Sequence, residues 1–187
     1  YETPYIANLK IVAERIDNFG GNDFTAKRYL NFYSEEIDHE LLTVKGELKG
    51  KGALIFASMI TTYEGINYLG IDDNGEPAKK KFKNVRTNAS GGSMNGSYTW
   101  ARLGFQGEMS ASLKLAADVD GIPNDGTIES LMRTLQGKTF WKQLHQGFIG
   151  TFDLKEGSES MKVLSAYIKV RLSKLSLINN EVKLDCD

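Results

Sequence analysis

The stretch from Val44 to Phe56 constrains the fold of this chain more than any other. An apolar stretch leads into a short loop that contains three glycines and three lysines, and a glycine-free apolar stretch follows. This order is typical of a strand, a turn and a helix. Consecutive N–H groups at a helix start carry a partial positive charge that suits a pyrophosphate. Glycine lets the backbone approach such a group because it has no Cβ. The sequence therefore predicts a site for a phosphorylated cofactor at this loop.

The length and composition of the chain indicate one globular domain. Its 187 residues are enough to bury a core, and 41% hydrophobic and 25% charged residues are ordinary values for such a domain. The net charge of −1 points to neither nucleic acid nor an anionic membrane as a partner. Because Cys186 is the one cysteine, an internal disulfide and a zinc site with several thiolates are excluded.

The compartment is predicted from features that the sequence lacks. No apolar run approaches the roughly 20 residues of a membrane span, so we expect no membrane partner. No signal peptide is visible, and the single cysteine fits a reducing compartment, so a cytoplasmic protein is expected. The chain begins at Tyr1 and not at Met, which indicates a piece of something longer, with a domain delivered from a larger secreted protein as the alternative.

Apolar spacing predicts an order of strands and helices along the chain. The segment 8–19 fits both a helix and a strand, and its clustered β-branched residues favour a strand. Thr127 is a good N-cap for one helix, and either Ser158 or Ser160 could cap the final helix. We expect a single domain, 1–187, with a core over 1–109 and a helical extension over 110–187. The remaining expected strands cover 28–33, 39–44, 82–88 and 103–109, and the expected helices cover 53–69, 94–102, 110–117, 128–135, the surroundings of Phe140 and Trp141, and a final stretch ending at Leu172.

Residues Leu42 to Gly52 resemble the acetyl-CoA loop of the GCN5-related N-acetyltransferases. That family carries Gln/Arg-x-x-Gly-x-Gly/Ala between its fourth strand and the next helix. Lys49 matches the first position in charge, and Gly52 matches the first glycine. Leu54 stands where the family has glycine or alanine, which is a departure from the pattern.

A second element, Asn95 to Phe105, resembles the late helix and strand of the same family. These elements often end in an aromatic residue followed by Leu-Gly-Phe, which appears here as residues 103–105. Trp100 stands where the family usually has tyrosine, and Tyr98 is close by. The two elements occur in the order that the resemblance requires and together cover 39–109. Residues 110–187 have no counterpart in the common core of the family.

The resemblance implies an α+β fold of the α/β type, with a mixed, mostly antiparallel twisted sheet flanked by helices on both faces. It also implies a splay between two central strands, where the pantetheine of acetyl-CoA or another acyl-CoA lies. Backbone groups near Leu42, Thr43 and Val44 would pair with the pantetheine amides. Asn95 is a further cofactor-binding candidate, or caps the helix that follows it. The N–H groups implied to hold the pyrophosphate belong to Lys49, Gly50, Lys51, Gly52, Ala53 and Leu54.

The activity that the resemblance implies is acetyl transfer to an amine. Such a reaction needs a base for the ammonium nucleophile and an acid for the leaving thiolate. His39 and Glu40 are candidates for the base, directly or through water, and Tyr98 is the candidate acid. Strand geometry puts His39 and Glu40 on opposite faces, so at most one is expected to face the cleft. The acceptor amine belongs to a small molecule, a protein or an aminoacyl-tRNA, and nucleic acid is a partner only in the last case.

Two other classes of function remain open. An ADP-ribosyltransferase-like effector or toxin domain fits the compact size, although its arginine, Ser-x-Ser and Glu-x-Glu arrangement is not visible. A non-enzymatic binding module would account for the long region after Met109. The dense basic stretch from Lys79 to Lys83, with Arg86, is a candidate for contacting the CoA 3′-phosphate or RNA, or is a solvated loop.

Overall fold

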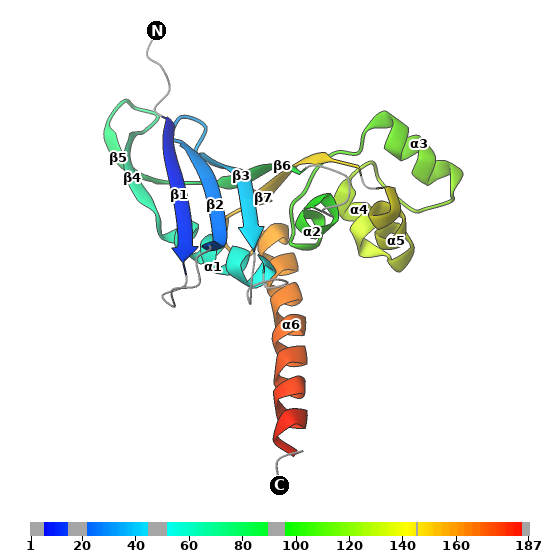
Figure 1. Cartoon of the computed structure of the whole chain (residues 1–187). Coiled ribbons are helices and arrows are strands. Elements are labelled where there is room, and N and C mark those ends of the chain that lie inside the picture. Colours follow the sequence, from blue (N-terminus) through cyan, green and yellow to red (C-terminus); the bar gives the residue numbers. More distant parts are fainter. Residues whose placement is uncertain (1–5, 15–21, 45–51, 90–95, 145, 185–187) are drawn as a thin grey trace.

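The computed structural model describes the backbone of residues 6–14, 22–44, 52–89, 96–144 and 146–184, and the side chains of 26–40, 42, 52–89, 97–144 and 146–173. It is a mixed α+β structure, as expected (Figure 1). The strands are β1 (Ile6–Glu14), β2 (Asn22–Asn31), β3 (Glu36–Val44), β4 (Asn67–Ile71), β5 (Pro77–Lys81), β6 (Asn84–Ala89) and β7 (Phe148–Asp153). The helices are α1 (Gly52–Gly65), α2 (Gly96–Arg102), α3 (Ala111–Val119), α4 (Ile128–Arg133), α5 (Leu135–Leu144) and α6 (Glu159–Leu184).

The central sheet has the order β1-β2-β3-β6-β7. Neighbouring strands are antiparallel except for β3 and β6, which run parallel. A parallel pair needs a crossover connection, and α1 together with the β4–β5 hairpin provides it. The sheet is therefore mixed and mostly antiparallel, with its one parallel pair in the middle.

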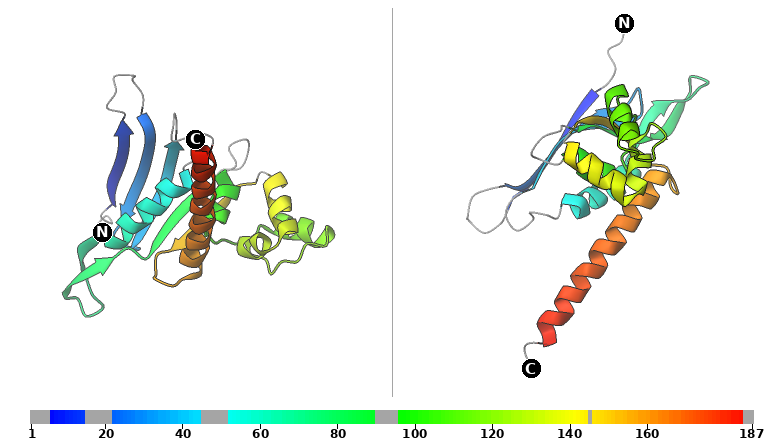
Figure 2. Two further views of the ribbon diagram at one scale, coloured as in Figure 1. Left: turned by 90° about the horizontal axis from the view of Figure 1, so that it is seen from below. Right: turned by 90° about the vertical axis from the view of Figure 1, so that its right-hand side faces the viewer.

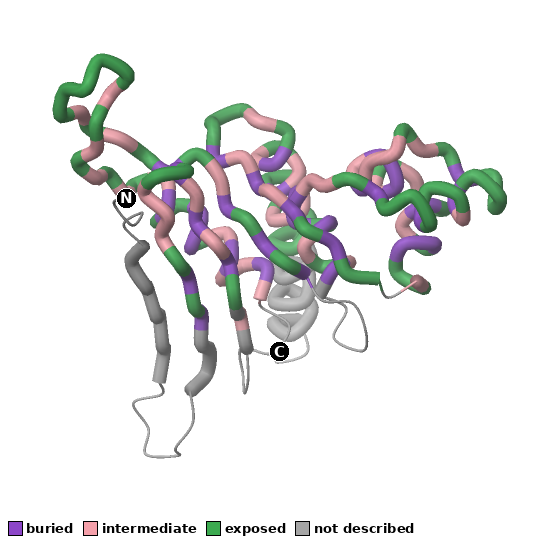
Figure 3. The backbone as a smooth tube through the Cα atoms, turned by 90° about the horizontal axis from the view of Figure 1, so that it is seen from above, coloured by how far each residue is buried: buried purple, intermediate pink, exposed green. Residues whose placement is uncertain are grey.

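The helices that pack on this sheet lie against one face of it (Figure 2, right). On α1, Phe56 contacts Phe152 of β7, with ring centroids 5.7 Å apart, and on α2 Trp100 contacts His39 of β3. The opposite face carries exposed side chains, and Figure 3 shows the alternation along the strands. The resemblance implied helices on both faces, so in the described part of the chain this expectation is wrong. The exposed residues of the open face include Lys27, Tyr29, Glu40, Arg86, Asn88 and Ile149.

The expected helical extension over 110–187 also needs correction, because β7 belongs to the central sheet. Its residues pair with β6 from Asn84↔Asp153 to Ala89↔Phe148. Phe148 and Phe152 point into the core and are buried. The last strand of the sheet therefore follows α2 to α5 in the sequence, and the core includes residues beyond Met109.

One predicted helix ends early, and one predicted strand is absent. The helix expected to reach residue 69 ends at Gly65, and β4 begins two residues later. The strand expected over 103–109 is instead a turn followed by two isolated bridges, Gln106↔Thr151 and Glu108↔Thr127. Gly104 takes a φ of 99° in this turn, a left-handed conformation that favours glycine.

The expected caps of two helices are confirmed. The Thr127 hydroxyl accepts a hydrogen bond from the Ser130 N–H at the start of α4. The Ser158 hydroxyl accepts one from the Met161 N–H at the start of α6. Both bonds satisfy an N–H that the first helical turn leaves without an intrahelical partner. The caps set where α4 and α6 begin, although α6 runs on well beyond the expected end at Leu172.

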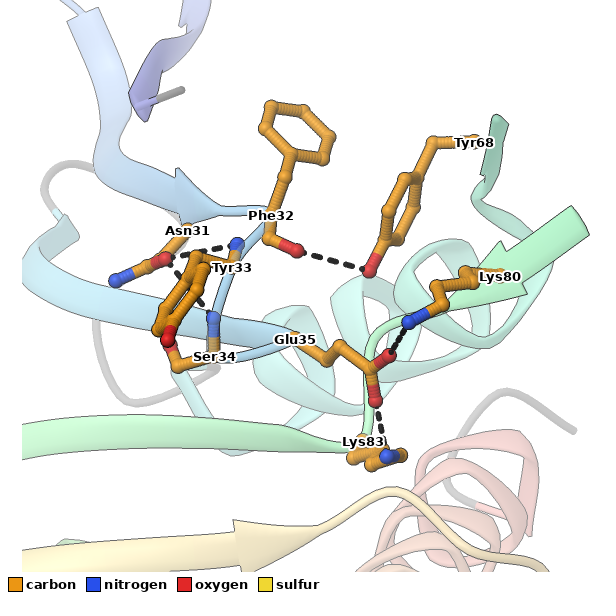
Figure 4. A network of polar contacts seen from close by, with 8 residues as sticks. All are labelled: Asn31, Phe32, Tyr33, Ser34, Glu35, Tyr68, Lys80 and Lys83. Atoms are coloured by element: carbon orange, nitrogen blue, oxygen red, sulfur yellow. Dashed lines mark hydrogen bonds and ion pairs between the residues drawn. The ribbon is translucent and has the colours of Figure 1, made fainter. Parts of the chain in front are cut away.

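Glu35 ties the β4–β5 hairpin to the start of β3 (Figure 4). Its carboxylate forms ion pairs with Lys80, 2.9 Å away, and with Lys83. Its backbone takes a φ of 57° in the turn between β2 and β3, where Asn31 accepts hydrogen bonds from the N–H groups of Tyr33 and Ser34. This network holds the hairpin at the amino-terminal ends of β3 and β6.

Candidate functional site

The parallel pair at the centre of the sheet separates partway along its length. The pairing runs from Glu36↔Asn84 to His39↔Thr87 and stops there. Strand β3 continues to Val44 and β6 to Ala89. Within the described sheet, these continuations pair only with the outer neighbours, β2 and β7. The two strands therefore diverge after His39↔Thr87, and their facing backbone groups have no ladder partner within the described sheet; we call the gap between the two ladders the opening.

A β-bulge lies immediately beside this opening. Lys27 pairs with Leu41 and Arg28 pairs with His39, so Glu40 has no partner of its own in the ladder. A bulge bends its strand and increases the local twist, and it re-aims the side chain that it carries. The bulge thus explains why β3 leaves β6 directly after His39, and it turns Glu40 to the open face of the sheet, where its side chain is exposed.

His39 lies on the helix-covered face at the base of the opening and is 6% exposed. Its ring contacts Trp100 of α2, with centroids 4.3 Å apart, and Phe56 of α1 at 6.3 Å. Its Nδ1 is buried and has no hydrogen-bond partner among the described residues. Burial and, secondarily, the charge of Arg28 lower the pKa of His39 to about 2. A ring that stays neutral down to that pH is a poor base for an ammonium group.

Arg28 stands opposite His39 in the ladder and is 1% exposed. Its Nε donates a hydrogen bond to the Tyr63 hydroxyl of α1 at 2.6 Å, and its Nη2 lies 3.5 Å from the Met59 sulfur. A buried guanidinium needs such partners because leaving it unsolvated is costly. Sequence reasoning missed this cluster, although an arginine inside an aromatic strand segment is a usable signal.

Glu40 has a different environment from that of His39. The interaction of its carboxylate with the Tyr29 side chain on β2 raises the pKa of the Tyr29 hydroxyl. Both residues are exposed on the open face. The expectation that His39 and Glu40 point to opposite faces is confirmed by their burial. Of the two, Glu40 is the one that is exposed to solvent.

The structure brings Trp100, not Tyr98, into contact with His39. Tyr98 is half-buried on α2, and the guanidinium of Arg102 lies 5.4 Å from its ring centroid. Among the described contacts, none joins Tyr98 to His39 or Glu40. The role of Tyr98 as an acid stays a prediction.

The expected cofactor loop is described only at its two ends. Strand β3 includes the backbones of Leu42, Thr43 and Val44, and Leu42 is half-buried. Helix α1 begins at Gly52, one residue before its predicted start, with Ala53 buried and Leu54 half-buried in its first turn. The other predicted cofactor-binding residues, Lys49, Gly50, Lys51 and Asn95, lie outside the described residues.

The basic stretch Lys79–Lys83 lies at the other end of the parallel strand pair from the carboxyl end of β3. It belongs to β5 and precedes β6, at the amino-terminal ends of the parallel pair. The opening and the start of α1 lie at the carboxyl ends. Lys80 and Lys83 are engaged with Glu35. This placement argues against contact of the stretch with a CoA bound at the opening.

Two surface hollows are formed by helices away from the opening. One of about 510 Å³ lies between α1 and α6, and its wall includes Ile60 and Leu164. The other, of about 580 Å³, lies beside α5, over Ile122 and Phe140. No residue predicted from the sequence as catalytic or cofactor-binding lines either hollow.

No family model, curated protein or solved structure matches the chain. In the described ranges, no three His, Cys, Asp or Glu side chains gather in a way that could hold a metal ion. The helices described here do not combine the length and apolar character that crossing a bilayer demands. The case for a function therefore depends on the site geometry.

Proposed function

We propose that this protein is an acyl-CoA-dependent N-acyltransferase that transfers an acetyl group to an amine acceptor. The observation that carries the proposal is the opening between β3 and β6 after His39↔Thr87, together with the start of α1 at Gly52, eight residues after β3 ends at Val44. Unpaired backbone groups along a strand accept an extended ligand in the manner of an added strand. The two amides of a pantetheine chain suit such a row.

The first turn of α1 supports the same ligand. Gly52, Ala53 and Leu54 begin this helix, and N–H groups in a first turn have no intrahelical partners. These N–H groups and the helix dipole both stabilise an anion bound at the start of the helix. Acetyl-CoA would supply the activated acyl group. The residues of this chain that would hold it are the backbone of Leu42 to Val44 and the N–H groups at the start of α1.

Within this proposal Glu40 is the base. It is exposed beside the opening, on a bulge that sets its direction, and its carboxylate raises the pKa of the neighbouring Tyr29 hydroxyl. Glu40 takes the proton from the acceptor ammonium, so that the free amine attacks the acyl carbon. Tyr98 remains the proposed donor of a proton to the leaving sulfur. His39 is buried beside the opening and takes no part in proton transfer.

Calorimetric titration with acetyl-CoA tests the proposal. We expect a micromolar dissociation constant for the wild-type chain and no measurable binding by Gly52→Glu, because a carboxylate at the start of α1 repels the pyrophosphate. Gly65→Glu places the same charge at the other end of the helix and should bind normally. Absence of binding by the wild-type protein at millimolar acetyl-CoA overturns the proposal. Glu40→Gln should retain acetyl-CoA binding and lose about 100-fold or more in transfer to an amine.

A further inference from the structure

Cations and aromatic rings alternate across three helices on one side of the molecule. Lys142 Nζ lies 6.0 Å from the Tyr98 ring centroid, and Arg102 follows at 5.4 Å from the same ring. The Arg102 guanidinium also lies 4.9 Å from the ring of Tyr167, and Arg171 lies 5.7 Å from that second ring. We call these five residues the cation–aromatic ladder. It runs from α5 over α2 to α6, helices that lie close together in Figure 1.

The ladder concentrates positive charge that no described carboxylate neutralises. The ion pairs found among the described residues both involve Glu35, which lies in the turn between β2 and β3 and not on the helices of the ladder. Lys138 stands one turn before Lys142 on α5 and adds a further cation to the same face. The three cations of the ladder are exposed, and both tyrosines are half-buried. The edges of the guanidinium groups are therefore available to an anion.

The stability gained by joining the three helices does not account for this arrangement. An exposed cation–π contact contributes about 0.5–1 kcal/mol, and bringing three like charges together offsets part of that gain. An arginine paired with a carboxylate would join α2 and α6 without the repulsion. A bound polyanion removes the repulsion and leaves the stacking in place.

The alternation of flat aromatic or guanidinium groups with positive charges indicates which kind of polyanion would bind. Single-stranded nucleic acids are held by cations that follow the backbone and by aromatic or guanidinium planes on which unstacked bases lie. The ladder offers both along one line, anchored by the hydrogen bond from Arg171 Nε to the Tyr167 hydroxyl at 3.1 Å. We propose that the cation–aromatic ladder binds single-stranded nucleic acid. The inference concerns binding alone and does not depend on acyl transfer, which is measured separately with acetyl-CoA.

Fluorescence anisotropy with a labelled uridine oligonucleotide tests the inference. The variant Arg102→Ala/Lys142→Ala/Arg171→Ala should bind at least 10-fold more weakly. Each single-strand phosphate contact contributes about 0.7 to the slope of log affinity against log salt, so the slope should become shallower by about 2. The matched control Lys79→Ala/Lys81→Ala/Arg86→Ala removes as much exposed charge elsewhere and should change affinity less than threefold.

Three further measurements make the result decisive. Arg102→Lys keeps the charge but loses the planar stack, so its affinity should lie between those of the wild type and the triple variant. Arg171→Ala changes one exposed side chain and should lower affinity even if the triple variant fails to fold. Duplex RNA or polyglutamate should bind more weakly than the single strand. Equal loss in the matched control, tighter binding of duplex or polyglutamate, or no binding by the wild type at low salt overturns the inference.

Discussion

The Nε of Arg28 donates a 2.6 Å hydrogen bond to the hydroxyl of Tyr63, joining β2 to α1 through two fully buried side chains. The bond joins the sheet to the helix at Arg28, the ladder partner of His39, where the pairing of β3 with β6 ends. Burial raises the pKa of Tyr63, so the hydroxyl remains protonated and accepts the bond through its oxygen lone pairs. The pair fixes α1 against the strands that would carry the ligand.

Replacing Tyr63 with phenylalanine should lower the free energy of unfolding by about 1–3 kcal/mol. The substitution keeps the ring and leaves the buried Arg28 Nε–H without this acceptor. Urea denaturation of both proteins measures the difference. Tyr33→Phe is the control, because Tyr33 is 87% exposed and its loss should cost less than about 0.5 kcal/mol. Equal effects of the two substitutions would show that the buried bond contributes nothing.

Acidification should destabilise the wild type through His39. The pKa of His39 is depressed to about 2 in the folded protein, so the unfolded chain takes up a proton first as pH falls below about 6.5. Stability from the neutral ring is complete above that pH and decreases below it. Between about pH 7 and pH 5, His39→Gln should gain about 2 kcal/mol relative to the wild type.

The measurement is urea denaturation of wild type and variant at several pH values. His145→Gln, a change of the other histidine in the chain, is the control for general effects of histidine loss. A difference between wild type and His39→Gln that stays constant over this pH range would mean that His39 titrates normally in the fold.

Glu35 should contribute stability at neutral pH that disappears in acid. Its ion pairs with Lys83 and Lys80 lower the pKa of its carboxyl below the ordinary value. Such a group stabilises the fold above its unfolded pKa of about 4.3 and loses that contribution as pH falls through the lower folded pKa. Thermal melts should therefore show Glu35→Gln less stable than wild type at neutral pH, with the gap closing below pH 4. A gap that persists in acid would assign the effect to the turn and not to charge.

Gly104→Ala should destabilise the protein far more than Gly121→Ala. Both glycines have a positive φ, so each substitution carries a conformational cost of about 1–2 kcal/mol. A Cβ at Gly104 would also lie 2.6 Å from the Ser160 carbonyl oxygen, whereas one at Gly121 would meet nothing within 4 Å. We expect Gly104→Ala to cost at least about 2 kcal/mol more, as measured by urea denaturation. Similar values would mean that α6 shifts freely away from the turn.

The first part of the central crossover was predictable because its signals are local, whereas the β4–β5 hairpin was not predicted. The apolar run of β3, the glycine-rich loop and the apolar start of α1 follow one another, and each is recognised by composition alone. The resemblance based on these residues also implied the parting of two central strands. The caps Thr127 and Ser158 were predictable for the same reason, since a cap depends on residues within one turn.

Features that depend on distant partners were not predictable. Strand β7 has only six residues with a glycine among them, so its sequence alone did not distinguish it from a loop, and its pairing with β6 defines it. The bulge at Glu40 depends on register against Lys27 and Arg28, which no local pattern encodes. The cation–aromatic ladder joins residues from three helices, so their alternation appears only after the helices have packed.

The late position of β7 has a consequence for biosynthesis. The amino end of a nascent chain leaves the ribosome first. One edge of β6 therefore has no strand partner until Phe148 to Asp153, which follow α5, have also emerged. An exposed strand edge is a template for pairing with other molecules. Chaperone dependence and co-translational aggregation should therefore depend on how quickly the segment from Gly96 to Leu144 is synthesised and folds, because β7 pairs with β6 only afterwards.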